Sequence, residues 1–87
     1  MVFTKHPLGK RNKPVPRRDY DTFKAAILAA LHRAELTHTE LLKELTKSLR
    51  GKFSCNVGWH LMVVKLDLEA RKLIERTSSS PQRYRLK

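Results

Sequence analysis

Apolar residues in the segment 56–71 fall on two opposite sides of a helix. At 100° per residue, one side carries Val57, Leu61, Val64 and Leu68, and the other carries Trp59, Val63, Leu66 and Ala70. A helix that is apolar on both sides is either deeply buried or shared between a core and a partner. This segment, with Asn56 as its N-cap, therefore constrains the fold more than any other. Charged residues are expected on its flanks as two weak i,i+4 pairs, Lys65–Glu69 and Asp67–Arg71.

Two further helices are expected before it. Between residues 20 and 34 the apolar positions recur at spacings of three and four, which predicts a helix that Asp19 or Asp21 can cap. Residues 37–40 read Thr-His-Thr-Glu, the pattern of a capping box in which Thr37 and Glu40 satisfy each other's backbone amides. Leu36 and Leu41 occupy the positions of a hydrophobic staple, and Gly51 is placed to end this second helix.

The C-terminal residues predict a β-hairpin. Residues 72–77 and 82–87 flank a Ser/Pro turn, and the second run alternates, with Tyr84 and Leu86 on one face and Arg83 and Arg85 on the other. The order of elements is then helix, helix, helix, hairpin, which is an α+β domain. We expect this domain to occupy residues 19–87.

This order resembles the winged helix-turn-helix fold over residues 20–86. The passage LDLEARKLIER at 66–76, followed by SPQRYRL at 80–86, looks like the stretch that leads from recognition helix to wing in many winged-helix regulators. More narrowly, the chain is similar to a family of small uncharacterised bacterial winged-helix proteins. The resemblance implies a three-helix winged helix-turn-helix with a C-terminal β-hairpin wing, in which Leu73 and Ile74 begin the first wing strand. Lys72 stands where the regulators usually carry glycine.

Positive charge is concentrated at the two ends of the chain. The net charge is +11, and residues 1–18 hold six basic and no acidic side chains, whereas residues 19–76 hold all eight acids. Residues 1–18 also hold three of the four prolines and show no apolar period, so we expect a flexible basic N-terminal arm. Such asymmetry indicates a polyanionic partner, nucleic acid before membrane, and DNA is the expected one.

The candidate site follows from this charge and from the resemblance. Guanidinium and ammonium groups neutralise phosphates without reading sequence, and the candidates lie on arm and wing: Lys10, Arg11, Lys13, Arg17, Arg18, Arg76, Arg83 and Arg85. In winged-helix regulators the early exposed positions of the third helix enter the major groove. The matching positions here offer only His60 as a polar group.

An alternative role for the third helix is protein interaction. The stripe of Trp59, Val63 and Leu66 lies opposite the expected core and would be an exposed apolar patch on a monomer. A second copy in a homodimer, a partner protein, or the folded-back segment 14–16 could cover it. The sequence leaves the three open.

Catalysis and cofactors have little support in the sequence. The four histidines are scattered without metal-ligand spacing, and the single cysteine, Cys55, excludes an internal disulfide and a cysteine-based zinc site. Cys55 has no identifiable histidine partner and is expected to be a quiet thiol. The chain has neither an apolar run long enough to span a membrane nor a secretory signal, so we expect a cytoplasmic binding protein without enzymatic activity.

Overall fold

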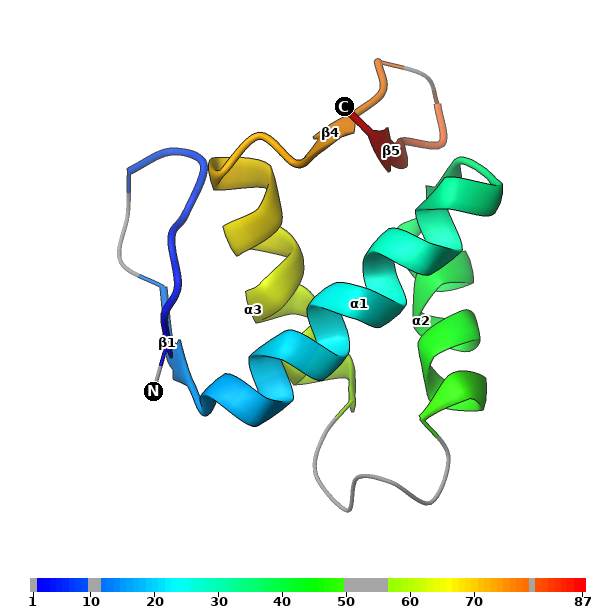
Figure 1. Ribbon diagram of the computed structural model, residues 1–87. Helices are drawn as coiled ribbons and strands as arrows, with labels where there is room; N and C mark the ends of the chain where they lie inside the picture. Colours follow the sequence, from blue (N-terminus) through cyan, green and yellow to red (C-terminus); the bar gives the residue numbers. More distant parts are fainter. Residues whose placement is uncertain (1, 10–11, 50–56, 79) are drawn as a thin grey trace.

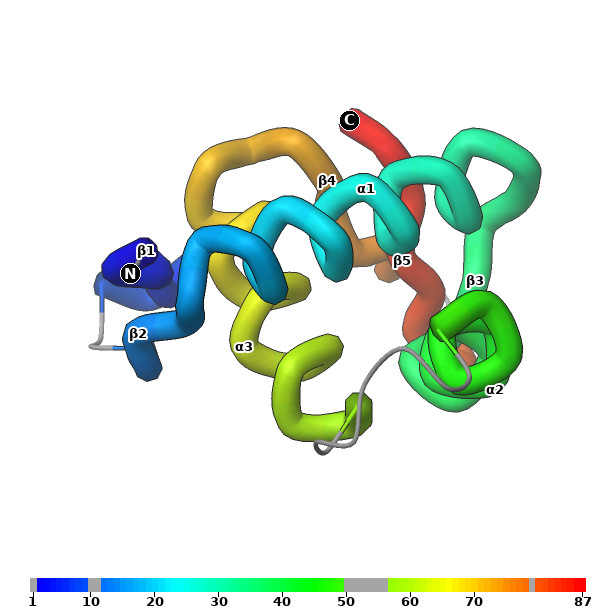
Figure 2. The backbone as a smooth tube through the Cα atoms, turned by 60° about the horizontal axis from the view of Figure 1, so that its bottom comes forward, coloured from blue at the N-terminus to red at the C-terminus, as the bar shows by residue number. Residues whose placement is uncertain are grey.

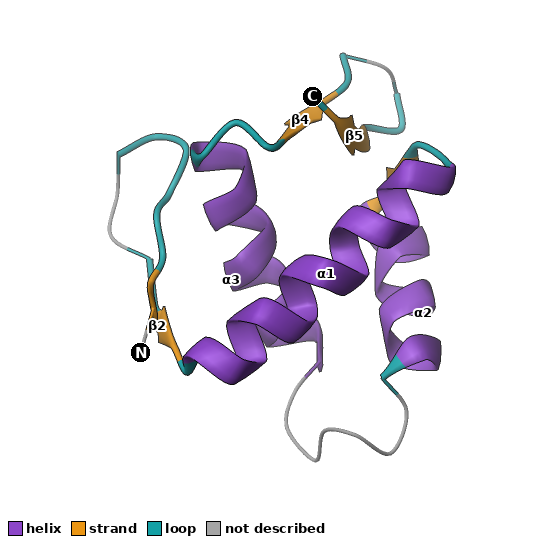
Figure 3. Cartoon of the chain, in the orientation of Figure 1, coloured by secondary structure: helices purple, strands orange, loops and turns teal. Residues whose placement is uncertain are grey.

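Three helices make up most of the molecule, and short antiparallel strands lie at two of its edges (Figure 1). The structure is a computed structural model that describes residues 2–9, 12–49, 57–78 and 80–87. Its elements are β1 (Val2–Phe3), β2 (Pro14–Val15), α1 (Arg17–Arg33), β3 (Leu36–Thr37), α2 (His38–Ser48), α3 (Val57–Ala70), β4 (Ile74–Arg76) and β5 (Arg83–Leu86). The fold class is therefore α+β, as expected (Figure 3). Within the described ranges no helix is both long and apolar enough to cross a membrane.

Helix α3 lies at the centre of the packing. Leu61, Val64 and Leu68 of the predicted core stripe are fully buried, and α1 and α2 both pack against the helix. Val63, from the opposite stripe, is fully buried as well. The helix is thus enclosed on more than one side. A deeply buried helix was one of the two possibilities that its two apolar stripes predicted.

Helix α1 begins earlier than the sequence predicted. It starts at Arg17 with Pro16 at the N-cap position and no side-chain cap, so the expected cap at Asp19 or Asp21 is wrong. Proline is tolerated at a helix start because the first amides have no intrahelical partner and its φ is already close to helical. Arg17 and Arg18 therefore belong to the first turn of α1 and not to an arm.

The start of α2 matches the capping-box prediction. The Glu40 amide donates to Thr37 Oγ1 at 3.2 Å, and the Thr37 amide donates to Glu40 Oε1 at 2.8 Å. The bond from the Thr37 amide lowers the pKa of Glu40. The predicted stop at Gly51 and the predicted cap at Asn56 lie outside the described residues.

The C-terminal hairpin forms as predicted, but it pairs with a third strand that the sequence did not reveal. The sheet order is β3-β5-β4, all antiparallel, with Leu36 opposite Tyr84 and Tyr84 opposite Arg76. Tyr84 is buried and Arg85 exposed, as the alternation predicted. Leu73, which the resemblance placed in the first wing strand, lies just before it and is exposed.

The end of α3 is a Schellman motif without a glycine. The Leu73 amide bonds to the Leu68 carbonyl and the Lys72 amide to the Glu69 carbonyl, both at 3.0 Å. Lys72 then takes the left-handed position, with φ of 63°, that glycine usually fills in this motif. The position that the resemblance marked as a departure is thus the one that requires a positive φ.

The N-terminal segment, which we expected from the sequence to be a flexible basic arm, contains two short paired strands. β1 pairs antiparallel with β2, and Val2 lies opposite Val15. Both valines belong to the core, and Val15 is 0% exposed. Strands of two residues are too short to show an apolar period, which is why composition alone did not reveal them. The folded unit therefore begins before residue 19, and Figure 2 shows this N-terminal hairpin at the end of the molecule opposite α2.

Candidate nucleic-acid interface

Two hydrogen bonds fix the N-terminal hairpin to α3. The Lys5 amide donates to Asp67 Oδ1 at 2.8 Å, and Asn12 Nδ2 donates to the Val63 carbonyl at 3.0 Å. Asn12 Nδ2 also donates to the Lys5 carbonyl at 3.1 Å, which ties the two sides of the hairpin together. Lys5 and Lys13 are therefore presented from backbone that is hydrogen-bonded to the rest of the molecule or to its neighbouring strand.

Asp67 is the buried anchor of this arrangement. Its carboxylate is fully buried and accepts hydrogen bonds from the Lys5 amide, the Tyr20 hydroxyl and the Arg71 guanidinium, the last at 2.9 and 3.0 Å. Burial and the bond to Asp67 raise the pKa of Tyr20 to about 12. The predicted Asp67–Arg71 pair is present, and the structure adds that Asp67 is fully buried.

The face of α3 that was expected to read bases is largely closed. His60 is 9% exposed, its ring stacks on Phe23 at 5.2 Å, and its Nε2 lies 3.7 Å from an Asp19 carboxylate oxygen. The expectation of an accessible His60 is therefore wrong, because the residue faces α1. Trp59 meets the His60 ring edge-on at 4.9 Å, and Met62, at 46% exposed, is the most open large apolar side chain of α3.

The fate of the second stripe follows from the same packing. Val63 is buried in one core with Val15 of the N-terminal hairpin, and Trp59 and Leu66 are half-buried. From the sequence, three groups could cover this stripe: a second copy, a partner protein or the segment 14–16. The structure contains the last of these, since Val15 lies in the same core as Val63. A monomer does not leave this stripe as a fully exposed patch.

The arginines of the C-terminal hairpin are held in ion pairs. Arg76 Nε bonds to Glu69 at 2.6 Å, Arg85 Nε to Glu75 at 2.6 Å, and Arg83 Nη1 lies 3.4 Å from Glu40. The bond to Glu69 raises the pKa of Arg76, and the bond to Glu75 raises that of Arg85. The pairs of Arg83 and Arg85 are solvent-exposed and therefore weak, so a phosphate can compete for these two arginines, whereas Arg76 is held by a largely buried carboxylate.

Basic side chains outside ion pairs gather on the N-terminal side. Apart from the buried Lys65, the described lysines and arginines without a carboxylate partner are Lys5, Lys13, Arg17, Arg18, Lys24, Lys43, Lys47, Lys72 and Lys87. Four of them, Lys5, Lys13, Arg17 and Arg18, are exposed on the N-terminal hairpin and the first turn of α1. We call these four the N-terminal basic face. Lys10 and Arg11 lie outside the described residues.

The position of Arg17 and Arg18 is electrostatically unfavourable within the protein itself. A helix N-terminus carries a partial positive charge, so cations in the first turn are disfavoured and anions are favoured. Neither arginine pairs with a carboxylate among the described residues, and Asp19 is the one acidic residue in the same turn. An external anion would relieve the repulsion and would also meet free helix amides.

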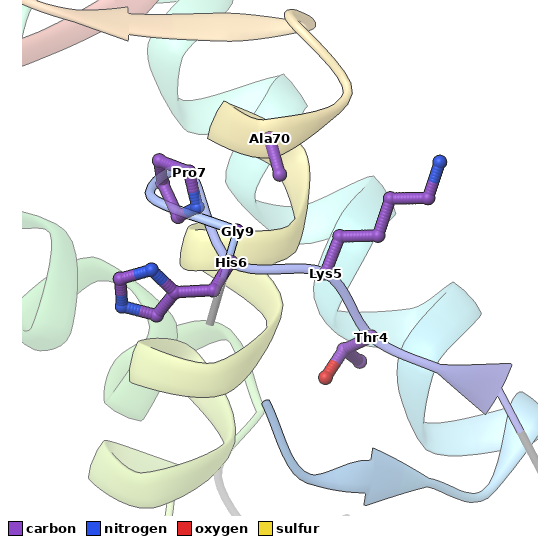
Figure 4. A pocket seen from close by; sticks show the side chains of 6 residues that line it. All are labelled: Thr4, Lys5, His6, Pro7, Gly9 and Ala70. Atoms are coloured by element: carbon purple, nitrogen blue, oxygen red, sulfur yellow. The ribbon is translucent and has the colours of Figure 1, made fainter. Parts of the chain in front are cut away.

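A shallow pocket of about 370 Å³ lies between the N-terminal loop and the end of α3 (Figure 4). Its lining includes Lys5 and His6, but their side chains point away from each other, and His6 Nδ1 already accepts a bond from the Leu8 amide at 3.1 Å. No three metal-ligating side chains gather anywhere in the described ranges. The pocket therefore lacks the convergent polar groups that a ligand or catalytic site needs.

A buried lysine is the feature that sequence reasoning missed. Lys65 is 5% exposed, and its Nζ lies 2.9 Å from His38 Nδ1 and 2.9 Å from the Tyr84 hydroxyl. Burial lowers its pKa to about 8. The expected exposed pair with Glu69 is not formed as a hydrogen-bonded pair, since Glu69 bonds to Arg76. The helical spacing indicates this burial, because Lys65 lies four residues after Leu61 and three before Leu68 and so falls on the core stripe.

These observations define a small α+β domain in which α3 is largely buried and the N-terminal basic face is exposed. The chain belongs to a protein family, described as a family of unknown function (DUF6958), whose model matches residues 1–84. No curated protein and no solved structure gives a significant match to the chain.

Proposed function

We propose that this domain is a winged helix. The element order α1-β3-α2-α3-β4-β5 and the sheet order β3-β5-β4 support the proposal, because the C-terminal hairpin then takes the place of the wing after the third helix. The N-terminal hairpin of β1 and β2 is an addition that packs on α3.

We further propose that the domain binds nucleic acid, duplex DNA above all, through its phosphates and not by reading bases. The N-terminal basic face carries this proposal: four exposed cations without a carboxylate partner lie on an ordered hairpin and on the first turn of a helix. Contacts of this kind give affinity without sequence information. Arg76, Arg83 and Arg85 are a second, weaker set because carboxylates already hold them.

Base reading by α3 and protein docking through its stripe have less support. His60 and Val63 are buried, so neither is available to a groove or to a second copy without opening the fold. The alternative proposal is a homodimer or partner interface on the stripe of Trp59, Val63 and Leu66, of which the half-buried Trp59 and Leu66 would make the contact. Catalysis is not part of either proposal.

The test is a matched pair of double variants. Arg17→Gln/Arg18→Gln removes two charges from the N-terminal basic face, and Lys43→Gln/Lys47→Gln removes two exposed charges from α2. Binding of a random-sequence DNA duplex is measured by fluorescence anisotropy over a series of salt concentrations. If both arginines contact phosphates, the first variant lowers the slope of log K against log salt by about 1.8 units.

The control variant should leave that slope nearly unchanged, and the sequence of the duplex should make little difference. Equal losses in the two variants would mean that binding follows net charge and not this face. A wild-type protein that fails to bind DNA even at low salt would refute the proposal. If the protein bound one duplex sequence and no other, the result would instead support base reading by α3.

A further inference from the structure

Titratable groups from α2, β5, β4 and α3 surround Lys65. His38 comes from the first residue of α2, Tyr84 from β5, Arg76 from β4 and Glu69 from α3 itself. Lys65 Nζ also lies 4.0 Å from the centre of the Tyr84 ring. Glu69 Oε1 is buried without a hydrogen-bond partner among the described residues, so it does not accept from Lys65. The two groups that hold the ammonium are thus His38 and Tyr84.

The chemistry of the three groups fixes one protonation state. A lysine ammonium has three donors and no acceptor, so both of its partners must accept. His38 Nδ1 can accept only while it carries no proton, and the Tyr84 hydroxyl accepts through its oxygen. A proton on Nδ1 would remove the hydrogen bond and leave two cations 2.9 Å apart in a buried site.

The place of these residues links the contact to the wing. His38 directly follows Thr37, which is opposite Arg83 in the sheet, and Tyr84 is opposite both Leu36 and Arg76. We propose that Lys65, His38 and Tyr84 form a proton-sensitive junction that holds β5 and the start of α2 against α3 while His38 is neutral and loosens when His38 is protonated. We call these three residues the Lys65 junction.

The direction of the effect follows from the environment. Burial, and then the nearby Lys65 charge, lower the pKa of His38 below its ordinary value of 6.5. A group whose pKa is lowered by folding stabilises the fold above its unfolded pKa, and this contribution is lost as the pH falls through the folded pKa. The junction is therefore closed at neutral pH and opens in acid.

The experiment is an NMR titration from pH 7.5 to 4.5 that follows the His38 ring and the backbone amides of β3 and β5. We expect His38 to titrate below 6.5, together with shifts of the amides around Leu36 and Tyr84. Lys65→Met removes the repelling charge and should raise the His38 midpoint. His32→Gln, which removes an exposed histidine of α1, should change neither the midpoint nor the amide shifts.

A second variant keeps the test independent of Lys65→Met folding. In His38→Asn the side-chain carbonyl can accept from Lys65 but cannot titrate, so the shifts of the β3 and β5 amides between pH 7.5 and 4.5 should disappear. The proposal is overturned if wild-type His38 titrates at or above 6.5. It is also overturned if the amide shifts persist in His38→Asn, or if a folded Lys65→Met leaves the His38 midpoint unchanged.

Discussion

Asp67 is the residue at which three parts of the chain meet. Its carboxylate accepts from the N-terminal hairpin, from α1 and from Arg71. A buried carboxylate is costly unless such donors surround it, and the donors in turn depend on it. The N-terminal hairpin and α1 are therefore both bonded to one side chain near the C-terminal end of α3.

Removing that carboxylate should weaken the fold. Asp67→Ala leaves the Tyr20 hydroxyl and the Lys5 amide without their acceptor, and each unsatisfied buried group costs about 1–3 kcal/mol. We expect a loss of about 2–4 kcal/mol in the free energy of unfolding, measured by urea denaturation. Asp21→Ala, which removes an exposed carboxylate of α1, should change stability little. Equal stability of the Asp67 variant and wild type would show that these bonds do not anchor the hairpin.

At Lys72, by contrast, we expect a substitution to stabilise the fold. It holds φ of 63° at the end of α3, a conformation that costs a non-glycine residue about 1–2 kcal/mol. Lys72→Gly should therefore raise the free energy of unfolding by up to about 1 kcal/mol, after the greater chain entropy of glycine is allowed for. The same change within α2, Lys43→Gly, should lower it by about 1 kcal/mol. A thermal melt distinguishes the two, and a destabilised Lys72→Gly would contradict the Schellman assignment.

Some of these residue-level features could be predicted from the sequence, and others could not. The Thr37–Glu40 box was predictable because its bonds are local in the chain. The burial of Lys65 and Asp67 was missed because a charged residue on a helix is ordinarily solvated, and only partners distant in sequence, such as Tyr84 and Tyr20, make burial tolerable.

At the scale of elements, the N-terminal hairpin changes what α3 can do. Its strands are two residues long, yet Val15 reaches the core and Asn12 bonds to the backbone of α3. The long helices were predictable from their 3.6-residue period. The short strands β1, β2 and β3 were not, because two residues cannot establish a period and their pairing partners lie 11 to 48 residues away.

The hairpin can be tested by a pair of truncations within it. Val15→Ala removes two buried methyl groups and should cost about 1–2 kcal/mol of stability by urea denaturation. Phe3→Ala, on the neighbouring strand, removes a side chain that is mostly exposed and should cost much less. A Val15 variant as stable as wild type would return the segment to the status of a loose arm, and the basic face would lose its fixed geometry.

At the scale of the whole molecule, stability should depend on pH through Lys65. Its pKa is about 8 in the folded protein and ordinarily 10.5, so the unfolded chain binds more protons between these values. The free energy of unfolding should therefore rise from pH 8 towards 10. The raised pKa values of Tyr20 and Tyr84 act in the opposite sense only above pH 10, where their ionisation favours unfolding.

Urea midpoints at pH 7, 8, 9 and 10 measure this rise. Lys65→Met should show a flatter profile over the same range, and because it keeps all the other basic groups, it also corrects for the relief of general charge repulsion. Parallel profiles for the two proteins would mean that Lys65 is not a buried ammonium at neutral pH.

The edge contact between Trp59 and His60 has an optical consequence. Trp59 is the single tryptophan of the chain, and its ring is half-buried where α3 meets α1 through the stacked rings of His60 and Phe23. Intrinsic tryptophan fluorescence therefore reports on the contact between α1 and α3 without any label. Far-ultraviolet circular dichroism, by contrast, reports on all three helices together. Coincident melting curves from the two signals would establish that the domain unfolds in one cooperative step.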